Sequence, residues 1–228
     1  MLTFIDISKV RVVHSNKYKQ GATYGFIHAD IYLPGNEPHP VAYKRGYVNI
    51  YPSGHYKRWI GKAAYEYLIN LPGAEIKIIK GIWLYPRYKR KPYYDLVHKL
   101  FAVKAAAKVS GDKELYYFTW KLTNSLYGKQ IQLIRKGNII EASTCWNPVY
   151  GAIITENTRI KVAKIQLEYP TSVAVFTDSV ISTEELPIEL SDELGGWSLK
   201  TYGLGVILGC GCYQIGDKVR FRGFPLPD

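Results

Sequence analysis

The chain has few of the residues that build disulfide frameworks, zinc clusters or membrane spans. Its 228 residues include three cysteines, Cys145, Cys210 and Cys212. They are too few for a disulfide framework and lack the second pair that a CxxC-type zinc site needs, so we predict small core or strand residues. No apolar run approaches the roughly 20 residues that span a bilayer, and no secretory leader is recognisable. We therefore expect a soluble, cytoplasmic protein with no membrane partner.

Positive charge is abundant. Thirty Lys and Arg residues against 19 Asp and Glu residues give a net charge of +11. In residues 85–94 the cations alternate with tyrosines, an arrangement that suits nucleic acid because cations displace counterions from phosphates and aromatic rings stack on bases. The alternative is a solvated basic surface, and the size of the excess favours nucleic acid. The predicted nucleic-acid contacts in this segment are Arg87, Lys89, Arg90 and Lys91.

The hydrophobic patterns predict strands first, helices in the middle and strands again. Strands are predicted at residues 2–7, 22–34, 74–79 and 171–181, with further strand signals at 197–199, 205–210 and 213–222. Helices are predicted at residues 61–71, 93–109, 114–126 and 149–166. The short break at Ser110-Gly111-Asp112 makes the second and third helices antiparallel. The predicted class is α+β, an antiparallel sheet with helices on one side and a projecting helical pair.

Two short segments carry a family resemblance. Residues 121–128, KLTNSLYG, and residues 175–180, VFTDSV, resemble the last two polymerase motifs of family B DNA polymerases, especially the compact viral and protein-primed branch. Residues 147–155 and 194–197 are similar to the stretches that follow these motifs in the family, and residues 93–108 look like its first fingers helix. The two motifs and the two stretches that follow them are four segments in register, which makes a chance match improbable.

The resemblance implies an antiparallel-sheet polymerase palm interrupted by a helical-hairpin fingers subdomain. The first part of the palm would be residues 1–92, the fingers 93–127, and the second part of the palm, with the catalytic hairpin, 128–228. We expect neither an exonuclease domain nor a thumb, and therefore a partner polypeptide that supplies exonuclease, thumb or primer function. A viral source would place the protein in the host cytoplasm.

The implied activity is template-directed nucleotidyl transfer from a dNTP to a DNA primer-template, with two Mg²⁺ (or Mn²⁺) ions held by carboxylates. Asp178 matches the family's metal-binding aspartate, and Asp6 is the candidate for the second catalytic ligand. Thr177, beside Asp178, is a predicted nucleic-acid contact. The predicted nucleotide-binding residues are Lys104, Lys121, Asn124, Ser125, Tyr127 and Gly128.

Three departures from the family pattern favour an alternative. Phe176 stands where the family has an additional aspartate, and Trp120 stands where it has a lysine. Lys121 is one place further on, which rotates the side chain by about 100° around a helix. The residues after Asp6 lack the aromatic of the first motif. The alternative is an inactive polymerase-like module that binds nucleic acid or a replication partner.

A third possibility is a metal-dependent nuclease. It would use Asp6 together with His28 and Asp30, which lie two residues apart and so share one face of a strand.

Overall fold

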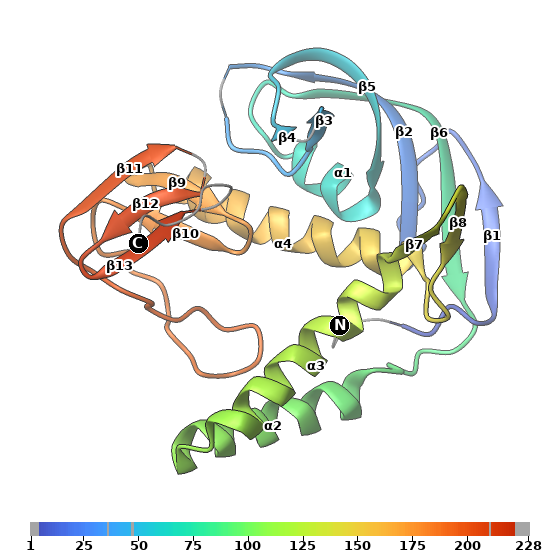
Figure 1. Cartoon of the computed structure of the whole chain (residues 1–228). Coiled ribbons are helices and arrows are strands. Elements are labelled where there is room, and N and C mark those ends of the chain that lie inside the picture. The colour runs from blue at the N-terminus through green and yellow to red at the C-terminus, as the bar shows by residue number, and fades with distance from the viewer. Residues whose placement is uncertain (1–4, 36, 47, 210, 222–228) are drawn as a thin grey trace. The chain divides into compact units, whose positions relative to one another are not determined.

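The computed structural model describes residues 5–35, 37–46, 48–209 and 211–221. The chain divides into two compact units, Met1–Leu167 and Glu168–Asp228. The first combines helices with antiparallel strands, and the second has antiparallel strands joined by loops. The predicted α+β class is confirmed (Figure 1). In the described part of the chain, no helix combines the length and the apolar character needed to cross a membrane.

A four-stranded antiparallel sheet forms the centre of the first unit. Its strand order is β1 (Val10–His14), β6 (Glu75–Pro86), β2 (Tyr24–Leu33) and β5 (Gly54–Gly61). Along β2, Ile27, Ala29 and Ile31 are fully buried and the residues between them are partly exposed. This two-residue period places one face of the sheet against the core. The predicted strands at 22–34 and 74–79 are confirmed.

Two helices cover the inner face of this sheet. Ala64 and Leu68 of α1 (Lys62–Leu68) belong to the core cluster with Ile27, and Ile160 of α4 (Pro148–Glu168) packs against that cluster. Full burial of each large apolar side chain contributes about 1.5 to 3 kcal/mol. Trp83 of β6 is also fully buried, and its indole N–H donates to the Ser15 carbonyl at 3.1 Å.

The two central helices form the predicted antiparallel pair. They are α2 (Tyr94–Ser110) and α3 (Lys113–Ile131), which lie side by side and project from the sheet (Figure 1). Gly111 ends α2 with a φ of 74°, a conformation that glycine adopts readily. Asp112 then starts α3, because its side chain accepts a hydrogen bond from the Leu115 N–H at 2.9 Å.

The remaining strands form small sheets. In the first unit, β3 (Tyr43–Arg45) pairs with β4 (Val48–Ile50), and β7 (Leu133–Lys136) with β8 (Ile139–Ala142). In the second unit, β9 (Ser172–Phe176) pairs with β10 (Ser179–Ser182). The second unit also has a three-stranded sheet of β11 (Gly205–Gly209), β12 (Cys212–Ile215) and β13 (Lys218–Phe221).

Some predictions were wrong. Residues 5–7 form a loop instead of a strand, and residues 1–4 lie outside the described residues. Residues 197–199 form no strand, although Trp197 makes an isolated bridge with Leu190. Cys145 is exposed in a turn, because the hairpin of β7 and β8 ends before it. Cys212 lies in a strand as predicted, and Cys210 lies outside the described residues.

Candidate functional site

Asp6 lies in the loop before β1 and is 5% exposed. Its Oδ1 accepts the Ser8 N–H at 2.8 Å, its Oδ2 accepts from Arg90 Nε, and its own N–H donates to the Arg90 carbonyl at 3.0 Å. The Ser8 backbone N–H, followed by the Ser8 side chain and Arg90, lowers the pKa of Asp6 to about 2. The carboxylate is therefore ionised at neutral pH, but both of its oxygens are engaged.

Two tyrosines, the half-buried Tyr24 and the buried Tyr150, hold the Asp6 loop in place. The Ile5 N–H donates to the Tyr24 hydroxyl at 2.7 Å. The Tyr150 hydroxyl accepts from the Ile7 N–H at 3.2 Å and donates to the Ile5 carbonyl at 3.1 Å. Burial raises the pKa of both tyrosines. Sequence reasoning missed these supports, although Tyr150 lies in the segment after the second motif.

The basic segment 87–91 joins β6 to α2 and is exposed. The guanidinium groups of Arg87 and Arg90 lie 5.9 Å and 5.7 Å from the Tyr88 ring centroid, and Lys91 Nζ lies 5.4 Å from that of Tyr94. The predicted interleaving of cations and aromatic rings is thus present in space. Of the four predicted nucleic-acid contacts here, Arg90 is committed to Asp6, which leaves Arg87, Lys89 and Lys91 as candidate phosphate contacts.

Most of the predicted nucleotide-binding residues lie on α3. Lys121, Asn124, Ser125 and Gly128 follow the i, i+3, i+4, i+7 spacing of one helix face, and all but the half-buried Gly128 are exposed. A Cβ added to Gly128 would meet nothing within 4 Å, so this face is open there. The helix continues to Ile131, beyond the predicted end at residue 126.

The other two predicted nucleotide contacts point toward neighbouring side chains. Tyr127 is half-buried, and burial raises its pKa although the positive charge of Arg159 on α4 acts in the opposite direction. Lys104 on α2 has its Nζ 4.9 Å from the Phe101 ring centroid. Lys121 Nζ lies 5.9 Å from the Tyr117 ring centroid, so both lysines lie along aromatic rings.

Asp178 lies in the second unit, at the two-residue turn between β9 and β10. Phe176 pairs with Ser179, which leaves Thr177 and Asp178 as exposed loop residues. Thr177 has a φ of 61°, a left-handed conformation that costs a β-branched residue about 1 to 3 kcal/mol. Such strain is characteristic of functional sites, and here it presents the Asp178 carboxylate at the tip of the hairpin.

The hairpin of β12 and β13 in the same unit provides an internal comparison. Ile215 pairs with Lys218, so Gly216 and Asp217 form an equivalent two-residue turn. Gly216 has a φ of 53° at the position that corresponds to Thr177, and Asp217 is exposed like Asp178. Glycine is the residue this conformation favours. The threonine is therefore the unusual choice.

Phe176 differs from the aspartate of the family pattern in both chemistry and environment. Its side chain is 8% exposed and stacks on Tyr213, with ring centroids 4.8 Å apart and an interplanar angle of 20°. The Ser179 hydroxyl donates to the Phe176 carbonyl at 2.8 Å. This position is part of the packing of the second unit and offers no metal ligand.

The structure gives no support to the nuclease alternative. Asp30 is 3.3 Å from His55 Nε2 and 4.0 Å from Lys57 Nζ, while Asp6 is held by Arg90. Among the residues that the structure describes, no three His, Cys, Asp or Glu side chains gather as a metal-binding group.

Two separate carboxylates, Asp6 and Asp178, offer hard oxygen atoms of the kind that Mg²⁺ and Mn²⁺ prefer as ligands.

Two cavities lie in the first unit. One, of about 540 Å³, is lined by Ile5 and Tyr24 beside the Asp6 loop and by Thr155, Glu156 and Arg159 of α4. Its charged lining residues are Lys62, Glu66, Glu156 and Arg159, and sequence reasoning assigned none of them to a cavity.

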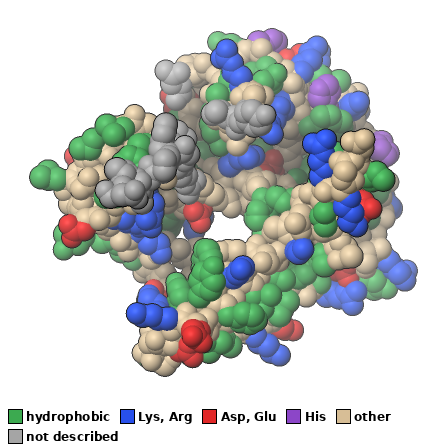
Figure 2. Space-filling model, viewed as in Figure 1, with side chains coloured by type: hydrophobic (Ala, Val, Ile, Leu, Met, Phe, Trp, Pro, Cys, Tyr) green, Lys and Arg blue, Asp and Glu red, His purple; other side chains and the backbone are tan. Residues whose placement is uncertain are grey.

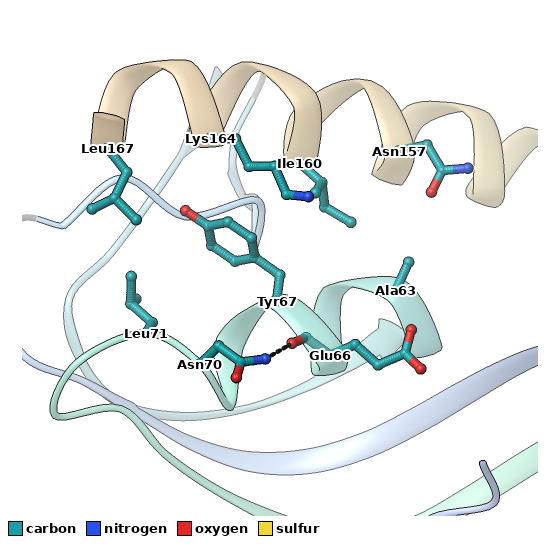
Figure 3. Close-up of a pocket in the computed structure, with 9 residues that line it drawn as sticks. All are labelled: Ala63, Glu66, Tyr67, Asn70, Leu71, Asn157, Ile160, Lys164 and Leu167. Atoms are coloured by element: carbon teal, nitrogen blue, oxygen red, sulfur yellow. Dashed lines mark hydrogen bonds between the residues drawn. The ribbon is translucent and has the colours of Figure 1, made fainter. Parts of the chain in front are cut away.

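The other cavity, of about 530 Å³, lies between α1 and α4, with Tyr67 extending from α1 toward α4 (Figure 3). Its lining includes Lys164 and Leu167 but none of the predicted site residues.

The Glu156 carboxylate fastens α4 to the sheet at the first cavity. Its Oε1 accepts the Gly61 N–H at 2.6 Å, and a Cβ added to Gly61 would lie 2.1 Å from its Oε2. Burial raises the pKa of Glu156, although hydrogen bonds from the Gly61 and Ala64 N–H groups and the charge of Arg159 oppose this rise. Glycine at position 61 is thus required by close approach of the carboxylate.

The chain has the fold of a DNA polymerase-like module. It matches solved structures of Phi29 DNA polymerase, with a TM-score of 0.67 at 14% identity for the ternary complex with primer-template DNA and incoming nucleotide substrates. That match covers 96% of this chain and 48% of the polymerase chain. The complex with single-stranded DNA gives a TM-score of 0.62 at 16% identity, covering 90% and 42%.

These likenesses concern the fold. No family model matches the chain, and neither does any curated protein. The chain spans less than half the length of the polymerase chains it matches.

Proposed function

We propose that this chain is the catalytic module of a DNA polymerase that adds dNTPs to a DNA primer-template. The observation that carries the proposal is the Asp178 carboxylate, presented by a strained two-residue turn within a polymerase-like fold. Phi29 DNA polymerase, whose fold the chain shares, has been solved with primer-template DNA and nucleotide substrates. The motif residues around Asp178 and on α3 support the same activity.

Asp178 and Asp6 would hold Mg²⁺ or Mn²⁺. When bound, these ions would neutralise the developing charge of an in-line phosphoryl transfer. The open face of α3, with Lys121, Asn124 and Gly128, would receive the nucleotide, and the cationic side chains of Lys104 and Lys121 would neutralise its triphosphate. Ser125 and Tyr127 belong to the same proposed pocket.

The primer-template would contact Arg87, Lys89 and Lys91 through its phosphates and Thr177 at the hairpin tip. Figure 2 shows Lys and Arg side chains interspersed with hydrophobic ones over the face that it draws, which suits a nucleic-acid partner. Arg90 has a separate role in this proposal, because its guanidinium holds the Asp6 carboxylate that would bind a metal ion.

The test is primer extension with Mg²⁺ or Mn²⁺, in which Asp178→Ala is compared with Asp217→Ala. The two aspartates are both exposed second residues of two-residue turns in the same unit, so the comparison controls for loss of a turn carboxylate. We expect Asp178→Ala to lower extension by at least about 100-fold and Asp217→Ala to leave it unchanged. Equal activities of the two variants would contradict the proposal.

A second candidate function is a polymerase-like module that binds nucleic acid without catalysis. Two observations favour it: Phe176 is packed on Tyr213 where the family has a carboxylate, and both oxygens of Asp6 are engaged. It predicts DNA binding that is insensitive to Mg²⁺ and to Asp178→Ala, with no extension by the wild-type chain under any metal ion.

A further inference from the structure

The outer face of the four-stranded sheet carries an ordered set of aromatic and cationic side chains. Directly opposed residues of an antiparallel pair lie on the same face, so the register defines three cross-strand rows. The rows are Trp59–His28–Lys80, Lys57–Asp30–Lys77 and His55–Tyr32–Glu75. Helices α1 and α4 cover the opposite face. The three rows together are called the outer-face platform below.

A β-bulge in β6 builds one corner of the platform. His28 pairs with Lys80 and Ala29 with Ile78, so Ile79 is an extra residue on β6. Strict alternation from Lys77, which points outward beside Asp30, would turn Lys80 into the core. The bulge returns Lys80 to the outer face, where its Nζ lies 5.5 Å from the Trp59 ring centroid. Bulges commonly re-aim side chains in this way.

The aromatic rings of the platform are available for stacking. Trp59 is 45% exposed and Tyr32 is 39% exposed. The His28 ring lies next to Trp59, with ring centroids 5.4 Å apart and an interplanar angle of 33°, and the centroid of the His55 ring lies 6.1 Å from that of Tyr32. Rows four residues apart along a strand are separated by about 13 Å, so two bases could stack without interfering with each other.

The charges of the platform favour a polyanion. Lys57, Lys77 and Lys80 are exposed beside the aromatic rings. The carboxylates are Asp30, which lies 3.3 Å from His55 Nε2 and 4.0 Å from Lys57 Nζ, and Glu75 at the start of β6. Stacking rings next to flexible cations are the combination that binds single strands, because bases in a duplex are already stacked on one another.

We propose that the outer-face platform binds single-stranded DNA, with bases stacked on Trp59 and Tyr32 and phosphates contacted by Lys57, Lys77 and Lys80. None of the motif residues lies on this face: Asp6 precedes β1, the nucleotide contacts lie on α2 and α3, and Asp178 lies between β9 and β10. Trp59 also borders the cavity beside the Asp6 loop, whereas Tyr32 and the three lysines do not line it. Only the choice of DNA over RNA rests on the proposed function.

The test is the binding of a short fluorescently labelled oligo-dT to the full chain, measured by anisotropy without metal ion or dNTP. Failure of the polymerase proposal would therefore leave this measurement unaffected. Trp59→Ala is expected to weaken binding roughly 5- to 150-fold, the loss of one stacked base. Trp59→Phe keeps a stacking ring and should stay close to wild type. Lys80→Ala should lower the salt dependence of log Kd by about 0.7.

Trp146→Ala is the matched control, because Trp146 has the same 45% exposure but lies in the loop before α4 and belongs to none of the three rows. Wild-type affinity of this variant, with weakened binding by Trp59→Ala, supports the platform. Unchanged affinity of Trp59→Ala, an equal loss in Trp146→Ala, or tighter binding of a duplex of the same length would overturn it. Tighter binding of oligo-rU than of oligo-dT would overturn the assignment to DNA. Far-UV circular dichroism checks that each variant is folded.

Discussion

Restoring the missing carboxylate by Phe176→Asp is expected to destabilise the second unit. The ring of Phe176 is 92% removed from solvent (8% exposed) and stacks on Tyr213. Removing such a ring costs about 3 to 5 kcal/mol, of which about 0.5 to 1.5 kcal/mol belongs to the aromatic pair. A unit as small as Glu168–Asp228 has a total stability of only about 3 to 9 kcal/mol. The substitution should therefore unfold this unit partly or completely.

The assay is urea unfolding followed by far-UV circular dichroism, with primer extension measured in parallel. Val173→Asp is the matched control, because Val173 lies on the same strand and is 53% exposed; we expect it to cost less than about 1 kcal/mol. A double-mutant cycle with Tyr213→Ala separates the stacking energy from the rest. Wild-type stability of Phe176→Asp, together with increased extension, would refute the reasoning, since it would show that position 176 still accepts a catalytic carboxylate.

Three further predictions concern the anchors of the candidate site. Gly61→Ala should lower the free energy of unfolding by about 1.5 to 3 kcal/mol, because the new Cβ displaces the Glu156 carboxylate. In a Glu156→Ala background the same substitution should cost less than about 1 kcal/mol. Equal costs in the two backgrounds, measured by urea titration, would contradict this. Because folding lowers the pKa of Asp6 from 3.8 to about 2, its contribution to stability is complete above about pH 4 and is lost as the pH falls toward 2. Asp6→Asn should make the melting temperature less dependent on pH across that interval. A pH dependence equal to that of the wild type would refute the proposed effect of the Arg90 and backbone contacts on Asp6. Thr177→Gly should raise the melting temperature or leave it unchanged, since the relief of strain outweighs a glycine entropy cost of about 0.5 to 1 kcal/mol; a clear decrease would show that the Thr177 side chain stabilises the turn.

The elements with strong local signals were predictable. Gly111 and Asp112 mark the end of one helix and the start of the next, and both boundaries were placed within a few residues. Strand β5 was missed because Trp59 and Lys57 alternate with Arg58 and Tyr56, so neither face shows the clean apolar period that identifies a half-buried strand. The hairpin of β7 and β8 was missed for a related reason, since its residues are largely exposed.

The candidate site was predictable only as a set of separate motifs. Asp6 could be singled out, but its partner Arg90 is 84 positions away and gives no local sign of the pairing. The burial of Phe176 likewise depends on Tyr213, which belongs to another sheet of the second unit. The β-bulge in β6 could not be predicted from the sequence either, because Ile79 resembles any other apolar strand residue until the register of β6 with β2 is known.

The hydrogen bonds between the Tyr150 hydroxyl and the Asp6 loop imply an order in which parts of the chain reach their final positions during synthesis. Tyr150 is 145 positions from Ile5 and 143 from Ile7, the residues that its hydroxyl holds. At 5 to 20 residues per second, a ribosome needs roughly 7 to 30 seconds to reach Tyr150 after Asp6 has been made. During this interval the sheet from β1 to β6 can form, but the Asp6 loop still lacks its hydrogen bonds to Tyr150 of α4. The earliest candidate ligand in the chain is therefore among the last to reach its final position.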